Sequence, residues 1–112
     1  MAEYSFGRLV IDGREYRRDV IILPDAVIDN WWREEGHRLS LSDLQQVLAA
    51  GVEVLVVGTG AYGVMKVPDQ VREKLLDKNI EVIVEPTGKA VKTFERLRSA
   101  GCKVAGAFHL TC

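Results

Sequence analysis

The hydrophobic residues of this chain fall into short runs that alternate with segments of helical spacing. Three runs, at residues 52–57, 80–84 and 103–110, are rich in valine or alanine and consist mostly of consecutive apolar residues. This pattern is typical of strands that are buried on both faces of a sheet. We therefore expect all three runs to lie in one central sheet.

Helices are expected before and between these strands. Apolar stripes with the spacing of a helix predict helices over residues 41–50, 68–78 and 88–100. Ser40 or Ser42 is expected to cap the first helix, and Thr87 the last. Strands separated by helices need crossover connections, so the sheet should be largely parallel and covered on both faces. The sequence thus predicts a single α/β domain over residues 1–112, a three-layer sandwich.

A β-hairpin is expected at the N-terminal end. Residues 6–11 and 14–23 flank Asp12-Gly13, a dipeptide that supplies the positive φ angles of a tight turn. Residues 20–23 are apolar on both faces, which predicts that this end of the hairpin is covered from both sides. Because a hairpin adds antiparallel strands, the sheet as a whole should be mixed.

The segment at residues 26–38 places Trp31-Trp32 between polar residues, and we interpret it as a short strand or extended stretch. Adjacent strand residues point to opposite faces, so one tryptophan should enter the core and the other should cover a neighbouring layer or meet a partner. Tryptophan and arginine dominate the energetics of protein interfaces. Trp31 and Arg33 are therefore candidates for an interaction surface, with plain core packing as the alternative for the tryptophans.

Composition and charge exclude several classes of protein. A chain of 112 residues with 47% hydrophobic and 28% charged residues suits one globular domain. Its net charge of −1 argues against nucleic acid as the main partner, because such domains are usually basic. No run is long enough to cross a bilayer, the start does not resemble a signal peptide, and two cysteines make no disulfide framework. We expect a cytoplasmic protein without membrane insertion.

Positive charge is concentrated between residues 88 and 103, where Glu95 is the only acid. A solvated helix face and a docking face for an acidic partner both fit this pattern. Lys89, Lys92 and Arg96 therefore join the candidate interaction surface.

Residues 58–63 read Gly-Thr-Gly-Ala-Tyr-Gly directly after a buried run, which is the glycine spacing of a dinucleotide-binding fold. In that motif the helix begins at the glycines, so that its free N–H groups face the pyrophosphate. Here the next helix start is Pro68, too far along the chain for that geometry. We therefore expect no dinucleotide and no other cofactor.

A cleft for a small anion is a second interpretation of these glycines. Ligands of α/β sheets bind at the carboxyl ends of parallel strands, where Gly58, Thr59 and Gly60 follow one strand and Thr87 the next. His109 joins these residues if the last strand of the chain lies beside the strand that ends at Val57. Free backbone N–H groups and a helix N-terminus both favour an anion. Alternatively, the glycines only permit a tight turn and Thr87 only caps its helix.

The histidine and cysteine residues of the chain do not predict a catalytic pair or a zinc site. His109 and Cys112 are three residues apart, so along a strand they project to opposite faces, and we expect no nucleophile–base pair between them. The close paired spacing of a structural zinc site is missing. No catalytic residue and no metal site are predicted.

Several short motifs carry a resemblance to a known family. They are Phe6-Gly7, Tyr16-Arg17-Arg18-Asp19-Val20, Trp32-Arg33-Glu34, Gly58-Thr59-Gly60, Lys66-Val67-Pro68, and the ending Val104-Ala105-Gly106-Ala107-Phe108-His109-Leu110-Thr111-Cys112. Together they resemble a family of small single-domain proteins of unknown function, whose eukaryotic relatives include the adipogenesis-associated domain-containing protein and the mitochondrial complex I assembly factor 3. The resemblance implies a three-layer α/β sandwich and no settled enzymatic activity. Phe94-Glu95 departs from the family, which commonly has tyrosine then asparagine there.

The sequence therefore favours a non-enzymatic, assembly-factor-like function that works through a protein partner. The alternative is a protein or enzyme that binds a small anion or metabolite at the loops of Gly58-Thr59-Gly60 and Thr87.

Overall fold

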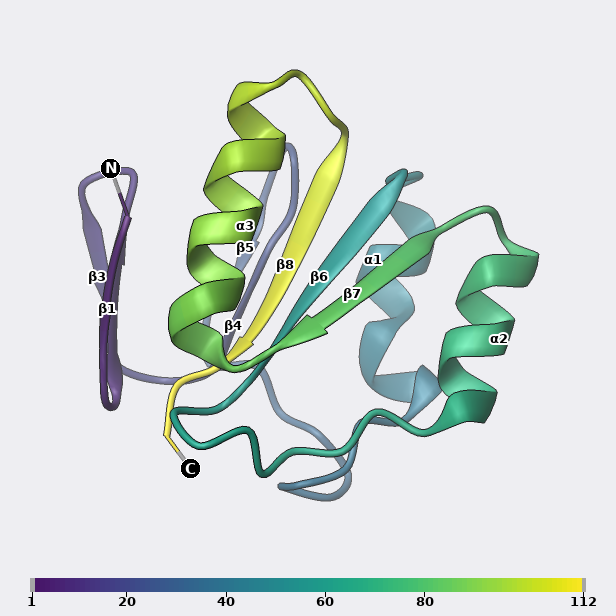
Figure 1. Cartoon of the computed structure of the whole chain (residues 1–112), viewed down its shortest axis with the longest axis horizontal. Helices are drawn as coiled ribbons and strands as arrows, with labels where there is room; N and C mark the ends of the chain where they lie inside the picture. Colours follow the sequence, from purple (N-terminus) through teal and green to yellow (C-terminus); the bar gives the residue numbers. More distant parts are fainter. Residues whose placement is uncertain (1, 112) are drawn as a thin grey trace.

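The computed structural model describes residues 2–111, and Figure 1 shows how their elements are arranged. The strands are β1 (Glu3–Ser5), β2 (Arg8–Ile11), β3 (Arg14–Tyr16), β4 (Val20–Ile22), β5 (Val27–Ile28), β6 (Val54–Thr59), β7 (Glu81–Glu85) and β8 (Val104–His109). The helices are the 3-10 helix η1 (Leu41–Leu44) and the α-helices α1 (Gln45–Ala49), α2 (Asp69–Asp77) and α3 (Thr87–Ser99). The three helices expected from the apolar stripes are thus present, although the first is a 3-10 turn followed by a short α-helix.

The central sheet is mixed, with the strand order β5-β4-β8-β6-β7. Strand β6 lies between β7 and β8 and is parallel to both, whereas β4 is antiparallel to β8 and to β5. The three valine- or alanine-rich runs do lie together in this sheet, as predicted. The register of β6 and β8 places Thr59 opposite His109, so the carboxyl ends of both strands meet at one edge.

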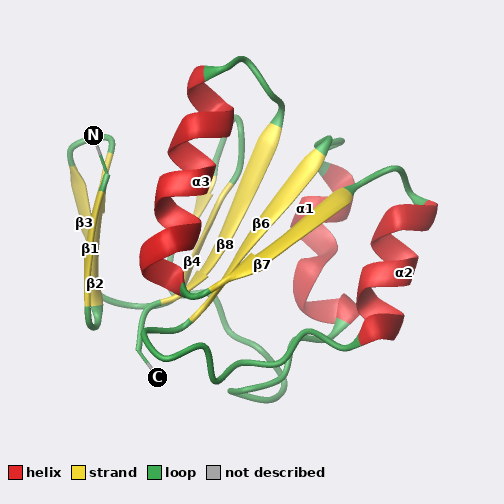
Figure 2. Cartoon of the chain, in the orientation of Figure 1, coloured by secondary structure: helices red, strands yellow, loops and turns green. Residues whose placement is uncertain are grey.

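The sheet is the middle of three layers (Figure 2). Leu55 and Val57 of β6 face the core shared with η1, α1 and α2, while Val56 faces α3 and the small sheet β1-β2-β3. This alternation follows from the two-residue period of a strand. The predicted three-layer α/β sandwich is therefore confirmed.

A glycine in β8 permits close packing of α3 on the sheet. A Cβ atom at Gly106 would overlap the Phe108 ring and lie 3.0 Å from the Phe94 ring. Those two rings meet edge to face, with centroids 5.5 Å apart. Only glycine leaves room for this aromatic pair.

The predicted N-terminal hairpin is wrong in its second arm. The turn at Asp12-Gly13 joins β2 to β3 with positive φ at both residues, but β3 ends at Tyr16. The apolar residues at 20–22 instead form β4, next to β8 in the central sheet. These side chains are 0–2% exposed, because only the interior of the large sheet covers both of their faces. Strand β1, which was not predicted, pairs with β2.

Two element ends matter for the site: the end of β6 differs from the predicted one, whereas the first helix begins after Ser40, one of its two predicted caps. Strand β6 continues through Gly58 and Thr59, which were expected in a loop. Helix η1 begins after Ser40, whose backbone N–H and hydroxyl both donate to the Asp43 carboxylate, at 2.9 and 2.8 Å. The capping pair is therefore Ser40 with Asp43, and the carboxylate is fixed at the start of the helix.

Candidate functional site

The residues of the predicted anion cleft do come together at the edge where β6 and β8 end. Gly60 donates its N–H to the Thr87 hydroxyl oxygen at 2.8 Å, and that hydroxyl donates to the His109 carbonyl at 2.6 Å. The Thr59 hydroxyl donates to the Glu85 carbonyl at 3.1 Å. These polar groups are thus paired with one another. Binding of an anion here stays a prediction, and it would require Gly60 to exchange Thr87 for the ligand.

Thr87 has a different role from the predicted helix cap. Pro86 is the N-cap of α3, and Thr87 is its first residue, with no exposed surface. Its hydroxyl ties the end of β6 to the end of β8. Gly58 is explained by this contact, because a Cβ atom there would lie 2.8 Å from the Thr87 hydroxyl oxygen and 3.0 Å from the Phe108 ring. A packing requirement therefore accounts for this glycine without any cofactor.

A buried polar cluster that sequence reasoning did not assemble lies beside this edge. Asp19 follows β3 and precedes β4, and its carboxylate oxygen Oδ2 is 2.7 Å from both Arg33 Nη1 and His109 Nδ1. The other oxygen, Oδ1, accepts the Leu110 N–H at 2.8 Å. The side chains of Arg33 and His109 are only 5% and 7% exposed. One carboxylate thus holds two buried nitrogen-bearing side chains.

Protonation in this cluster follows from its contacts. Burial raises the pKa of the Asp19 carboxyl, but hydrogen bonds from His109, the Leu110 N–H and Arg33 lower it by more, so that the pKa lies below its ordinary value. Nδ1 of His109 also lies 3.1 Å from Arg33 Nη2. A guanidinium can only donate hydrogen bonds, so this contact taken alone would make Nδ1 an acceptor. Because Asp19 is ionised and closer, we infer that Nδ1 carries a proton and donates it to Asp19.

The same arginine anchors the segment that carries the tryptophans. Arg33 donates to the Gly36 carbonyl from Nε at 3.2 Å and from Nη2 at 2.9 Å. Its guanidinium carbon lies 4.8 Å from the centre of the Trp31 ring, within cation–π range. Trp31 donates its indole N–H to the Asp43 carbonyl at 3.0 Å, and its backbone N–H to the Asp19 carbonyl at 2.7 Å. Positions 31 and 33 therefore face inward and are held on several sides.

Trp32 lies between these two anchors and faces the solvent. Its side chain is 76% exposed, compared with 6% for Trp31. The backbone continues to Glu34, whose N–H donates to the Asp43 carboxylate at 3.1 Å. The alternation predicted for the tryptophan pair is thus observed, although the segment is extended chain rather than a strand.

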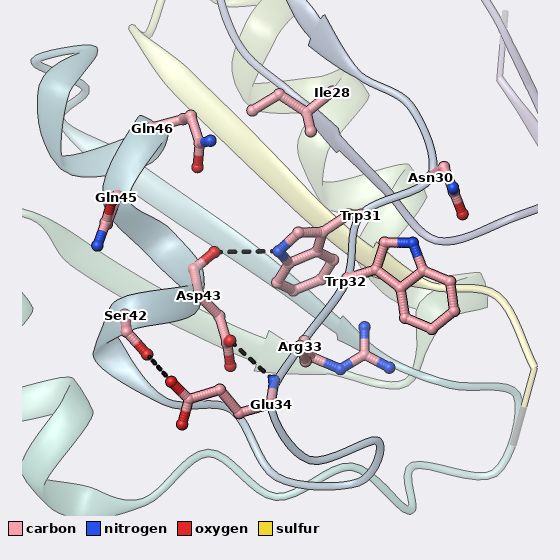
Figure 3. A pocket seen from close by; sticks show the side chains of 10 residues that line it. All are labelled: Ile28, Asn30, Trp31, Trp32, Arg33, Glu34, Ser42, Asp43, Gln45 and Gln46. Atoms are coloured by element: carbon pink, nitrogen blue, oxygen red, sulfur yellow. Dashed lines mark hydrogen bonds between the residues drawn. The ribbon is translucent and has the colours of Figure 1, made fainter.

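Two cavities flank Trp32. The first, shown in Figure 3, has a volume of about 530 Å³ and lies between the tryptophan segment and the start of helix α1. It is lined by Ile28, Asn30, Trp31, Trp32, Arg33, Glu34, Ser42, Asp43, Gln45 and Gln46. The second has about 330 Å³ and is lined by Arg18, Asp19, Asn30, Trp31, Trp32, Arg33 and Gly36. Trp32 therefore forms a ridge between two hollows.

The residues of the predicted interaction surface do not all lie at the surface or on the same face. The side chains of Trp31 and Arg33 are buried and make internal contacts, so neither is a free surface group, and the exposed tryptophan is Trp32. Lys89, Lys92 and Arg96 do lie exposed on α3, where Lys89 Nζ is 3.5 Å from Glu85. Helix α3 covers the opposite face of the central sheet from the core that contains Trp31. The basic residues and the tryptophans thus belong to two separate surfaces.

Asp19 is the residue that sequence reasoning missed at this site. The available signal was an acid directly before a run that is apolar on both faces, since a carboxylate at that position is drawn toward the interior and needs partners. Its partners Arg33 and His109 were each singled out, but 14 and 90 residues separate them from Asp19, and only strand pairing joins them.

Clusters of metal ligands and membrane-spanning helices are both missing from the part of the chain that the structure describes. Within residues 2–111, no group of three or more histidine, cysteine, aspartate or glutamate side chains is placed to hold a metal ion. The rings of His37 and His109 are 5.8 Å apart, and Cys102 is half-buried with a free thiol. Cys112 lies outside the described residues. Among the helices of residues 2–111, none has the length and apolar character to cross a bilayer.

Comparison with known proteins places the chain in a family. A family model described as "Protein of unknown function (DUF498/DUF598)" matches residues 1–109, so the chain belongs to this family. The conserved hypothetical protein PH1505 from Pyrococcus horikoshii OT3 is 30% identical, with a TM-score of 0.88 over 100% of this chain and 99% of that chain. Rpa2829 from Rhodopseudomonas palustris is 30% identical, with a TM-score of 0.79 over 97% and 82%. An outer membrane protein from Bartonella henselae is 26% identical, with a TM-score of 0.82 over 98% and 92%.

Proposed function

We propose that this member of the family is a protein-docking module whose binding hot spot is Trp32. The observation that carries the proposal is a tryptophan with 76% of its surface exposed, set between two cavities on a backbone that buried neighbours hold in place. Exposed large aromatic side chains beside hollows are typical of interface centres.

The area that Trp32 can bury against a partner is large enough to contribute strongly to the free energy of binding. Covering about 150 Å² of its side chain at about 25 cal/mol per Å² would contribute about 4 kcal/mol before the costs of association. Those costs include the ordering of flexible groups at the interface. Here Trp31 and Arg33, which flank Trp32, are already fixed by hydrogen bonds and by the ion pair of Arg33 with Asp19, so binding has to order fewer groups.

The buried cluster has a positioning role in this proposal. Asp19 binds Arg33 and His109 through one oxygen and the end of β8 through the other. Through its backbone carbonyl it also accepts the Trp31 N–H. The cluster therefore couples the tryptophan segment to the central sheet, which suits a binding surface that must keep its shape.

A selection experiment tests this function without knowledge of the natural partner. A library of random 12-residue peptides displayed on phage would be selected on the wild-type protein, and the enriched peptides would be titrated against Trp32→Ala. Truncation of a hot-spot residue costs at least about 2 kcal/mol, so affinity should fall about 30-fold.

Tyr62→Ala is the matched control, because Tyr62 is also 76% exposed and does not line either cavity. It should leave the affinity of the selected peptides unchanged. Peptides that bind Trp32→Ala as tightly as the wild type would refute the docking function at this site.

A further inference from the structure

We propose that the cavity of about 530 Å³ beside Trp32 receives an arginine side chain of the docked partner. This inference rests on the docking function proposed above and specifies the chemistry of its partner. The charges that line the cavity and its aromatic wall both favour such a side chain.

The lining of this cavity has an unbalanced negative charge. Its charged residues are Arg33, Glu34 and Asp43. Arg33 is paired with Asp19, a carboxylate outside this cavity, at 2.7 Å, so its charge is already compensated. Two carboxylates therefore remain without a cation within the lining, which favours a positively charged occupant.

Glu34 is the carboxylate that is free to bind the occupant. Asp43 is used inside the protein: its Oδ1 accepts the Glu34 N–H, and its Oδ2 accepts two donors of Ser40. Among the hydrogen bonds formed within residues 2–111, the Glu34 side chain takes part in one, in which its Oε1 accepts the Ser42 hydroxyl at 2.9 Å. Its Oε2 is available, and Glu34 is an exposed residue among those that line the cavity (Figure 3).

The aromatic and apolar parts of the lining suit arginine better than lysine. The face of a tryptophan ring attracts a cation, and a planar guanidinium stacks on it while donating in its plane. Ile28 offers an apolar contact for the three-carbon stem, and Gln45 and Gln46 supply polar groups along helix α1. A guanidinium in this cavity would have both an aromatic wall and the Glu34 carboxylate within the lining, and its planar fork uses such a set better than the point charge of a lysine does.

The second hollow has the opposite character, which directs the cation to the first. Its charged residues are Arg18, Arg33 and Asp19, and Asp19 is committed to the buried cluster. The free charge there is Arg18, an exposed residue whose Nη1 lies 3.5 Å from Asn30 Oδ1. A basic side chain on that side of Trp32 would meet a like charge.

A titration with small probes tests the inference on the intact protein. N-acetyl-arginine N-methylamide would be compared with its neutral isostere, N-acetyl-citrulline N-methylamide, by following the indole N–H signal of Trp32 in 15N–1H NMR spectra. The arginine probe should shift this signal saturably and bind about five-fold more tightly than the citrulline probe. Glu34→Gln should remove most of that preference, while Glu35→Gln, the same charge change at an exposed neighbour outside this cavity, should retain it.

Three results would overturn the inference: no shift with either probe, equal affinity for both probes, or equal effects of Glu34→Gln and Glu35→Gln. The peptide selection separates this failure from failure of the docking function. Selected peptides that depend on Trp32 but carry no enriched basic residue would refute the arginine site and leave the docking function standing. Peptides that ignore Trp32 would refute both.

Discussion

Replacement of Asp19 by asparagine is the sharpest test of how the site is built. Asparagine has the same shape but no charge, so the Arg33 side chain, which is only 5% exposed, would stay buried without a counter-ion. The side-chain amide would also face the Nδ1 of His109 with a donor or a neutral acceptor in place of a carboxylate. Loss of one partner from a buried ion pair costs about 3–5 kcal/mol. We expect about 3 kcal/mol here, because the Asp19 side chain is 16% exposed and water can reach it.

The measurement is urea unfolding of both proteins at pH 7, followed by circular dichroism and by tryptophan fluorescence, to which Trp31 and Trp32 both contribute. For a domain of this size, a loss of about 3 kcal/mol corresponds to a melting temperature lower by about 10–15 °C. Asp12→Asn is the matched control: it removes the same charge from an ion pair with Arg98, but the Asp12 side chain is 62% exposed. That variant should lose less than about 1 kcal/mol. Equal losses in the two variants would refute the buried-cluster argument.

The pH dependence of the same pair of proteins gives an independent check. The pKa of Asp19 in the folded state lies below its ordinary value of 3.8, so this group stabilises the fold above that pH, and the stabilisation is lost as the pH falls through the folded-state pKa. The stability difference between wild type and Asp19→Asn should therefore be constant near neutral pH and shrink below about pH 4. A difference that stays unchanged down to pH 2 would show that charge at Asp19 does not contribute.

Two further predictions concern packing around the sheet. Thr87→Val should cost about 2 kcal/mol in urea unfolding and speed hydrogen exchange at the Gly60 amide, because the valine leaves that N–H and a β8 carbonyl without their partner; Thr87→Ser should retain most of the stability, and equal losses in both would contradict the hydrogen-bonding role. Gly106→Ala should cost about 1–3 kcal/mol, because the new methyl group would overlap the Phe108 ring, whereas Gly36→Ala, with no atom within 4 Å of its added Cβ, should change little in the same assay.

The local pattern of residues determined most of the architecture. The three apolar runs form β6, β7 and β8, and the periodic stripes form α2 and α3 close to the predicted bounds. Both signals act over a few residues: a strand that is buried on both faces must be apolar at successive positions, and a helix on a sheet must repeat its apolar residues every three to four positions. The three layers follow once these elements are known.

The tertiary structure alone decided the site. The run at residues 20–22 could be covered by a hairpin partner or by the central sheet, and its position beside β8 brings Asp19 to His109 over a separation of 90 residues. Which tryptophan is buried depends on the Asp43 carbonyl that accepts the Trp31 indole, and so on how η1 lies against the segment. Such contacts join distant segments through strand order and element packing, whereas local residue patterns report only which face of an element is buried.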